Sequence, residues 1–143
     1  MTGKVSEYMT RKVISVPSDT GIREAFFKMK KHHIRHLPIV DADNKLIGIV
    51  SDRELRRPEW VDESLDVAHM YRLDDEMSVG DVMISRVHVI HTYDTLRKAV
   101  KLLIENHIGA APVLDKTGEL VGMLSAVDLL RALDDLMGGE KQG

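Results

Sequence analysis

The chain repeats itself, and this duplication constrains the fold more than any other feature. When the sequence is shifted by 74 residues, the 25 residues from 33 to 57 fall on 107 to 131 without a gap, and nine positions are identical. A repeat at a fixed spacing indicates one supersecondary unit that occurs twice, with each copy too small to bury a large core alone. The identical pairs are His33/His107, Ile34/Ile108, Pro38/Pro112, Asp41/Asp115, Leu46/Leu120, Gly48/Gly122, Ser51/Ser125, Leu55/Leu129 and Arg57/Arg131.

Each copy predicts the same order of elements: strand, helix, strand, strand, helix. The first helix carries apolar residues at i, i+3, i+4 and i+7, the stripe of a helix with one buried face. The turn-rich segments DADNK and DKTGE each predict a hairpin between the last two strands. The last helix begins at Ser51 or Ser125, and Gly138 with Gly139 is expected to end the second one. The predicted strands are 13–16, 37–40 and 46–50, then 87–90, 111–114 and 120–124.

The resulting fold class is α+β, built from two β-α-β-β-α repeats. We expect a first repeat at 1–57, a connector at 58–76, a second repeat at 77–137 and a tail at 138–143. The repeats also align upstream, at Val5/Val79 and Met9/Met83, with one residue inserted in the first copy between Thr20 and Ala25.

Charge is unevenly distributed along the chain. The first repeat has twelve bases and seven acids (+5), the connector one base and seven acids (−6), and residues 77–143 seven bases and nine acids (−2). The connector is interpreted as a solvated linker, or as a lid or partner contact that uses Trp60 and Tyr71.

Composition excludes several functions. With no cysteine there is no disulfide scaffold, thiolate metal site or thiol nucleophile. Aromatic residues make up 4% and the net charge is −3, so a nucleic-acid partner is not expected. No apolar run approaches the roughly 18 residues of a membrane span, and the N-terminal stretch lacks the apolar region of a signal peptide. We therefore expect a cytoplasmic protein with no membrane partner.

No catalytic or metal-binding constellation is evident. G-x-S-x-G, Walker A and G-x-G-x-x-G motifs are absent, so the chain is not expected to be an enzyme. His32, His33 and His36 cluster in the sequence, but no H-E-x-x-H motif occurs and a zinc site needs three or four converging ligands. We expect surface histidines and no metal.

The repeated segment G-h-h-S-x-x-[ED], at 48–54 and 122–128, is the strongest candidate for chemistry. A glycine inside a strand marks close approach by another backbone or by a ligand. The serine lies where a helix begins, which favours an anion, and the acid three residues later can accept hydrogen bonds from vicinal hydroxyls. This combination suits a nucleotide. The same S-x-x-[ED] spacing is also a capping box, and duplication alone explains its recurrence, so both interpretations stay open.

On these motifs the chain resembles the tandem cystathionine-β-synthase (CBS) domain pair, or Bateman module, from about Val5 to Leu136. The resemblance also rests on VSEYMTRKVISV with VGDVMISRVHVI and on HIRHLPIVD with HIGAAPVLD. It implies two repeats packed about a pseudo-twofold axis, with clefts that bind adenosine compounds such as AMP, ADP, ATP or S-adenosylmethionine. The arrangement is similar to stand-alone small CBS proteins of the acetoin-utilisation type.

The resemblance also implies roles for single residues. The serines would contact phosphate and the acids ribose hydroxyls, and Glu54 departs from the family's aspartate by one methylene. Arg35, His36 and Arg53 have no basic counterparts in the second copy, so they either neutralise phosphate or form a solvated basic face. The adenine-slot positions are also compatible with simple core packing. The implied ligand-binding residues are Ser51, Glu54, Ser125 and Asp128, with Ile14, His36 and Pro38 or His88, Ala110 and Pro112 lining the adenine slots.

Two functions follow. The first is a regulatory sensor, a homodimer that binds an adenosine ligand, needs no cofactor and modulates a partner protein. The second is a structural or oligomerisation module whose clefts are vestigial.

Overall fold

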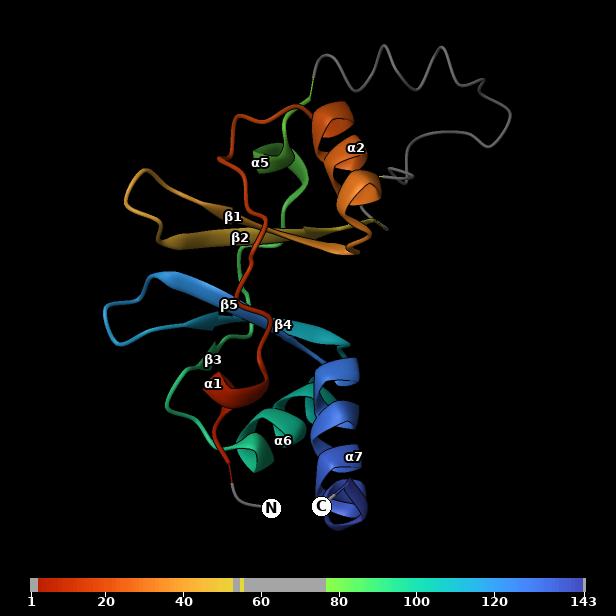
Figure 1. Ribbon diagram of the computed structural model, residues 1–143. Coiled ribbons are helices and arrows are strands. Elements are labelled where there is room, and N and C mark those ends of the chain that lie inside the picture. Colours follow the sequence, from red (N-terminus) through yellow and green to blue (C-terminus); the bar gives the residue numbers. More distant parts are fainter. Residues whose placement is uncertain (1–2, 53–54, 56–76, 143) are drawn as a thin grey trace. The chain divides into compact units, whose positions relative to one another are not determined.

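The computed structural model describes residues 3–52, 55 and 77–142 (Figure 1). Arg53 and Glu54 therefore lie outside the described residues. So do the acidic connector with Trp60 and Tyr71, and most of the helix expected after Ser51.

The chain divides into two compact units whose boundaries differ from those of the sequence repeats. Unit 1 consists of Met1–Val13 with His88–Gly143, and unit 2 of Ile14–Val87. Each unit therefore combines the V-x-[ED]-x-M segment of one repeat with the strands and helices of the other. In Figure 1 the red helix α1 (Val5–Tyr8) lies among the blue-green elements of the second repeat.

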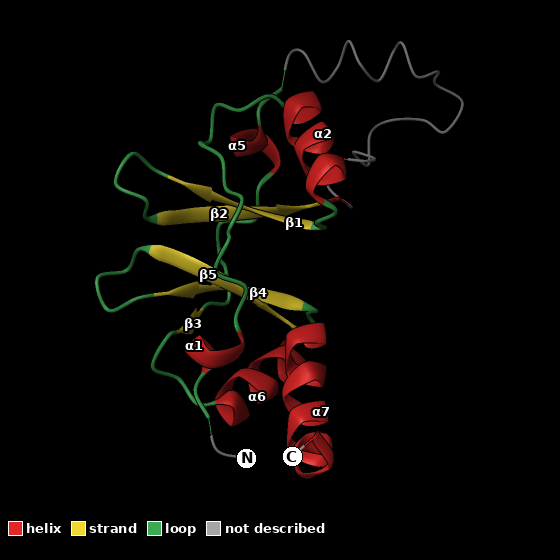
Figure 2. Ribbon diagram, viewed as in Figure 1, coloured by secondary structure: helices red, strands yellow, loops and turns green. Residues whose placement is uncertain are grey.

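Unit 1 contains a three-stranded sheet and three helices. The strand order is β3-β4-β5, from Ile90–His91, Ala110–Leu114 and Leu120–Ser125, with β3 parallel to β4 and β4 antiparallel to β5. Besides α1, the helices are α6 (Leu96–Asn106) and α7 (Ala126–Gln142), and both contact each other (Figure 2).

Unit 2 repeats this plan with fewer described elements. Helix α2 (Ile22–His32) precedes the antiparallel pair β1 (His36–Val40) and β2 (Leu46–Ser51), and α5 (Val79–Val82) packs on β2. Val16 bridges Ile39 in parallel, as Ile90 pairs with Val113 in unit 1.

Each unit has its own apolar core. The V-x-[ED]-x-M segment that comes from the other repeat, here called the borrowed segment, contributes to this core. The core of unit 1 includes Val5 and Met9, and the core of unit 2 includes Val79, with Met83 packed against it. The spaced apolar residues of α2 and α6 face these cores, as the sequence pattern predicts: Ile22, Ala25 and Met29, then Leu96, Ala99 and Leu103.

Three expectations about local structure were wrong. The first concerns the inserted residue, because Thr20 and Asp94 make equivalent hydrogen bonds, accepting at their carbonyls from Val79 and Val5. The shift of 74 therefore holds without a gap.

The second wrong expectation concerns the first strand of each copy, which is reduced to Val16 and to β3. The chain passes from one unit to the other at 13/14 and at 87/88, inside the two predicted strands. Only the last residue of each predicted strand pairs with a neighbour: Val16 with Ile39, and Ile90 with Val113.

The third error concerns the end of the last helix. Helix α7 continues through Gly138 and Gly139 to Gln142. A glycine cap needs the left-handed conformation, and among the described glycines only Gly3 and Gly118 have positive φ. The helix caps of this kind are instead His33 and His107, both at φ 54° and ψ 43° after α2 and α6.

Candidate functional site

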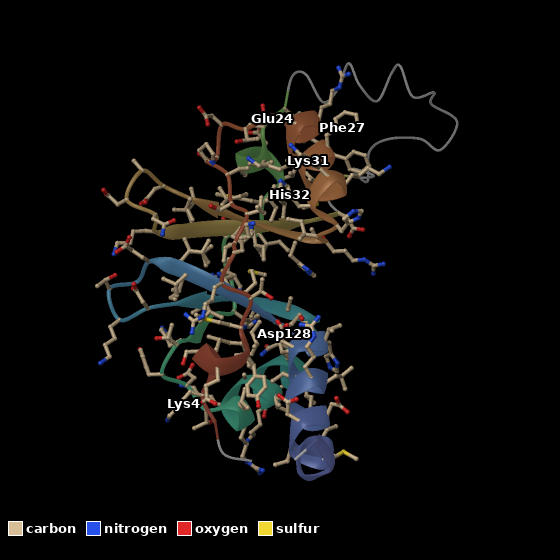
Figure 3. The ribbon with its side chains drawn as sticks, viewed as in Figure 1. Lys4, Glu24, Phe27, Lys31, His32 and Asp128 are labelled. Carbon is tan, nitrogen blue, oxygen red and sulfur yellow. The ribbon has the colours of Figure 1, made fainter. Side chains whose placement is uncertain are left out.

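The junction of β5 with α7 holds the most complete version of the predicted site. The Ser125 amide donates to Asp128 Oδ2 at 2.9 Å, and the Asp128 amide donates to Ser125 Oγ at 3.2 Å. This reciprocal pair is a capping box, the alternative that the spacing left open. Asp128 is only 3% exposed, at the strand end of α7 (Figure 3).

The capping box leaves part of each side chain free for a ligand. A serine hydroxyl that accepts one hydrogen bond still has its proton to donate, which suits a phosphate oxygen. A carboxylate has about four acceptor positions, and the bonds from Ser125 and Arg131 use two of them. Capping and ligand binding are therefore compatible at this junction.

Arg131 contacts the candidate site and was not among the residues predicted from the sequence. Its Nη1 donates to Asp128 Oδ1 at 2.9 Å, while its side chain remains 69% exposed. Because the Arg131 side chain is mostly exposed, it has room to turn away when a ligand replaces it on Asp128. The available signal was the identity of Arg57 and Arg131 in the repeat, each three residues after the acid of the motif.

The helix N-terminus offers less to an anion than its sequence suggests. The Ala126 amide donates to the Gly109 carbonyl at 2.8 Å, and the Asp128 amide is taken by Ser125. Of the first three amides of α7, this leaves that of Val127. In unit 2 the Asp52 amide is engaged in the same way by the Arg35 carbonyl at 3.0 Å.

Strand register brings some of the predicted residues together. Ala110 lies opposite Ser125 on neighbouring strands, and His36 lies opposite Ser51. Serine and adenine-slot candidates therefore meet at one end of each hairpin. His36 is half-buried and Arg35 is exposed.

The remaining candidates are less clearly placed for a ligand. Pro38 and Pro112 are buried in the middle of β1 and β4, and the Pro38 carbonyl accepts from Val16, so both contribute to the cores. Ile14 packs at the edge of the unit 2 core, whereas His88 is exposed and begins the second segment of unit 1.

The motif glycines have a structural reason that does not involve a ligand. A Cβ on Gly122 would lie 2.7 Å from Met9 Sδ and 3.0 Å from the Thr10 carbonyl oxygen, and Gly48 meets Met83 and Ile84 in the same way. The approaching group is the borrowed V-x-[ED]-x-M segment. The close approach of protein atoms therefore explains both glycines without a ligand.

The part of the chain that the structure describes contains no cluster of three or more histidine or acidic side chains able to hold a metal. His33 serves as the C-cap of α2, and His32 is exposed beside it. Within the same residues no helix is long and apolar enough to cross a membrane.

Comparison with known proteins identifies the family. A model described as the CBS domain matches residues 5–59 and 79–135. A CBS domain-containing protein of Dictyostelium discoideum is 30% identical over 136 residues, which are 90% of each chain. The structure of AcuB from Vibrio cholerae, assigned to acetoin utilisation, has a TM-score of 0.79 and 27% identity over 100% of this chain and 98% of its own.

A further solved structure is that of CBSX2, an Arabidopsis thaliana protein, in complex with AMP. It has a TM-score of 0.75 and 26% identity, and the match covers 94% of this chain and 98% of that one. The family model covers most of the sequence and both copies of the repeat. The chain therefore belongs to the CBS-domain family and carries two CBS domains.

Proposed function

We propose that this protein is a regulatory sensor that binds an adenosine-containing ligand and thereby modulates a partner protein. The single observation that carries the proposal is the Ser125–Asp128 junction, where a hydroxyl proton and spare carboxylate acceptors lie together at a helix N-terminus. The AMP complex of CBSX2, a relative of similar length and fold, supports the choice of an adenosine ligand. A CBS pair is a regulatory module, so we propose no catalytic role.

In this proposal Ser125 donates to a phosphate oxygen and Asp128 accepts from the ribose hydroxyls. Ala110, which lies opposite Ser125, marks the adenine side of this site, and Pro112 and His88 are the further adenine-side residues that the family resemblance implies. Because Asp128 is held by its amide contacts and nearly buried, it is oriented before the ligand arrives, which lowers the entropy lost on binding.

The corresponding site in unit 2 combines Ser51 and Glu54 with Ile14, His36 and Pro38. Arg35 and Arg53 add positive charge for the phosphate. Glu54 has one more methylene than Asp128 and loses more side-chain entropy when it is ordered, so we propose that this site is the weaker one.

Regulation requires the ligand to favour one state of the module over another. A ligand shifts such an equilibrium only by its difference in affinity for the two states. The sensor therefore has to change its affinity for the regulated partner when the nucleotide is bound, and the coupling is reciprocal.

The test is calorimetric titration with AMP, ADP, ATP and S-adenosylmethionine. We expect binding of at least one of them, and no binding of any at about 1 mM would overturn the proposal. Asp128→Asn should weaken binding about tenfold or more, because charged hydrogen bonds contribute about 1.5–3 kcal/mol. Asp128→Ala should weaken it more than Glu54→Ala, and equal losses would contradict the ranking of the sites.

Asp81→Asn is the matched control. Ser78 and Asp81 form the same capping box at α5, with the Ser78 amide donating to Asp81 Oδ2 at 2.9 Å. This variant removes a carboxylate charge from a capping box outside the proposed ligand site, at a position that is exposed rather than buried. If it weakens binding as much as Asp128→Asn, loss of a cap rather than of a ligand contact explains the result.

The second candidate, an oligomerisation module, is favoured by an apolar stripe on α7. Its side chains are 41–63% exposed and carry no charge: Val127, Leu130, Leu133, Leu136 and Met137. A second copy of this chain suits the stripe, because an antiparallel α7 pair also brings Arg131 near Asp134 and Asp135 of that copy. Light scattering should show a dimer that Leu130→Glu converts to a monomer. A dimer that binds no nucleotide would favour this function over the sensor.

A further inference from the structure

Unit 1 contains a groove at the opposite end of its hairpin from Ser125. The groove has a volume of about 530 Å³, within the roughly 300–1,000 Å³ usual for small-molecule sites. Val121, on its wall, is four residues before Ser125 along β5, or about 13 Å at the strand rise. The groove is therefore separate from the proposed nucleotide site. Its walls include Lys4, Met9, Arg11, Tyr93, Asp115 and Val121.

Two unpaired cations lie on the rim of the groove. Lys4 and Arg11 flank α1 and are exposed, and neither forms an ion pair with a described carboxylate. Arg11 Nη2 donates to the Ser6 carbonyl at 2.7 Å, which holds the guanidinium beside the groove and leaves its other donors for a ligand.

The acid of the groove is committed to the hairpin turn. Asp115 Oδ1 accepts from the Thr117 amide at 2.9 Å, from Thr117 Oγ1 at 2.6 Å and from the Glu119 amide at 3.0 Å. These bonds stabilise the carboxylate charge locally. Lys4 and Arg11 therefore leave the rim of the groove with a net positive charge, which favours an anion.

An aromatic face stands beside the cations. The Tyr93 side chain is 49% exposed, and its ring stacks on His91 with centroids 5.1 Å apart and planes 20° apart. Stacking on His91 restricts the ring, so Tyr93 presents a fixed flat surface to a ligand. Met9 and Val121 are apolar side chains that line the same groove, and we call them its floor.

The duplicated unit shows that the fold does not require these groups. In unit 2 the positions of the two cations are Ser78 and Ser85, and the position of the tyrosine is Asp19. The floor is apolar in both units, because Met83 is equivalent to Met9 and Ile47 to Val121. The same backbone thus carries two positive charges and an aromatic ring in one unit, and none of them in the other.

We infer that the groove of unit 1 binds a small aromatic carboxylate. The carboxylate lies between Lys4 and Arg11, where the guanidinium fork matches its two oxygens. The ring of the ligand stacks on Tyr93 above the apolar floor. This ligand class needs no ribose or phosphate contact, so the site is independent of the nucleotide proposal.

The probe for this site is 1-naphthoate, titrated calorimetrically against the full chain, with 1-naphthalenemethanol as its uncharged analogue. We expect naphthoate to bind and the alcohol to bind at least about tenfold more weakly, because the alcohol forms no charge-assisted hydrogen bonds with Lys4 and Arg11. Equal binding of the two probes, or no binding of naphthoate at about 10 mM, overturns the inference.

Variants copied from unit 2 locate the site. Arg11→Ser and Lys4→Ser should each weaken naphthoate binding about tenfold, and Tyr93→Asp should abolish it. Lys12→Ser removes an exposed neighbouring charge outside the groove and should have no effect. Equal losses with Lys12→Ser would show general charge attraction and refute the site. Arg11→Lys keeps the charge without the fork, so full affinity in that variant contradicts the proposed carboxylate geometry.

The same titrations separate this inference from the sensor function. The double variant Lys4→Ser, Arg11→Ser should bind AMP as the parent chain does, and Asp128→Asn should leave naphthoate affinity unchanged. If Asp128→Asn weakens naphthoate as much as AMP, the two ligands share one site and the inference fails.

Discussion

The two units share the backbone hydrogen bonds that hold the borrowed segment, but they differ in the side-chain hydrogen bonds that stabilise their turns and helix starts. Thr10 and Met123 exchange reciprocal amide–carbonyl bonds in unit 1, as Ile84 and Ile49 do in unit 2, all between 2.8 and 3.0 Å. The turn before the first helix differs. In unit 1 the buried Asp94 accepts from the His91 amide at 2.8 Å and pairs with Lys98 at 3.3 Å. In unit 2 the equivalent residue is Thr20, which is equally buried.

The caps of the two equivalent helices differ in the same direction. Thr95 caps α6 by accepting from the Lys98 amide at 3.1 Å, whereas Gly21 precedes α2 with no side chain to do so. The cores and the borrowed segment therefore maintain the duplicated backbone, while the polar side chains of the two units have diverged. We expect unit 1 to be locally the more stable of the two.

The largest effect is expected from filling the space above a motif glycine. Gly122→Ala should lower the free energy of unfolding by about 1–3 kcal/mol, because its Cβ meets Met9 and the Thr10 carbonyl. Gly48→Ala should cost a similar amount in unit 2. Chemical denaturation measures both. Gly109→Ala is the control, since nothing lies within 4 Å of its Cβ. If Gly109→Ala is as harmful as the others, the close approach of the borrowed segment does not explain the glycines.

The buried acid of unit 1 should contribute more than its counterpart. Asp94→Ala leaves the His91 amide without its acceptor, so we expect a loss of about 1–2 kcal/mol in the free energy of unfolding. Thr20→Ala should cost less, because the turn of unit 2 uses no carboxylate at this position. Hydrogen exchange of the His91 amide gives a local readout, and equal losses in both variants would remove the difference between the units.

A smaller effect is expected from transferring a cap. Gly21→Thr places the side chain of Thr95 at the start of α2, where φ is −66°, ψ is 149° and nothing lies within 4 Å of the new Cβ. We expect a gain of about 0.5–1 kcal/mol from the cap and from the smaller entropy of the unfolded chain. Thr95→Gly should give a loss of a few tenths. A destabilised Gly21→Thr protein would show that unit 2 needs glycine there for another reason.

The sequence alone predicted the repeat, the helices α2, α6 and α7, the hairpins and the α+β class, because periodicity and turn chemistry are local signals. It did not predict the exchange of the V-x-[ED]-x-M segments, since nothing in Val5 or Met9 indicates which core will accept them. The shared glycines were the nearest clue, and their close neighbour proved to be protein.

The candidate site was predicted in part. The spacing of Ser125 and Asp128 predicts the capping box that the structure contains. The family resemblance places Ala110 in the same region, and the strand register puts it opposite Ser125. Arg131 was missed because an exposed arginine usually indicates only solvation. The groove at Lys4 and Tyr93 was beyond prediction, since its residues are almost 90 positions apart and meet only through the segment exchange.

The smallest effect concerns the pH dependence of the borrowed segment. Burial raises the pKa of Tyr8 above its ordinary value of 10.0, and the negative charge of Asp135 and its hydrogen bond to the phenol raise it further. The folded chain therefore holds this proton more tightly than the unfolded chain. Its contribution to stability is complete below pH 10 and is lost as the pH rises through the raised pKa.

Between pH 9 and 11 the free energy of unfolding should fall more steeply with pH for the parent chain than for Tyr8→Phe. Asp135→Asn should move the Tyr8 titration, followed by absorbance at 295 nm, to lower pH. An unchanged titration would mean that α7 does not hold α1 through this pair, and that the borrowed segment of unit 1 depends on Val5 and Met9 alone.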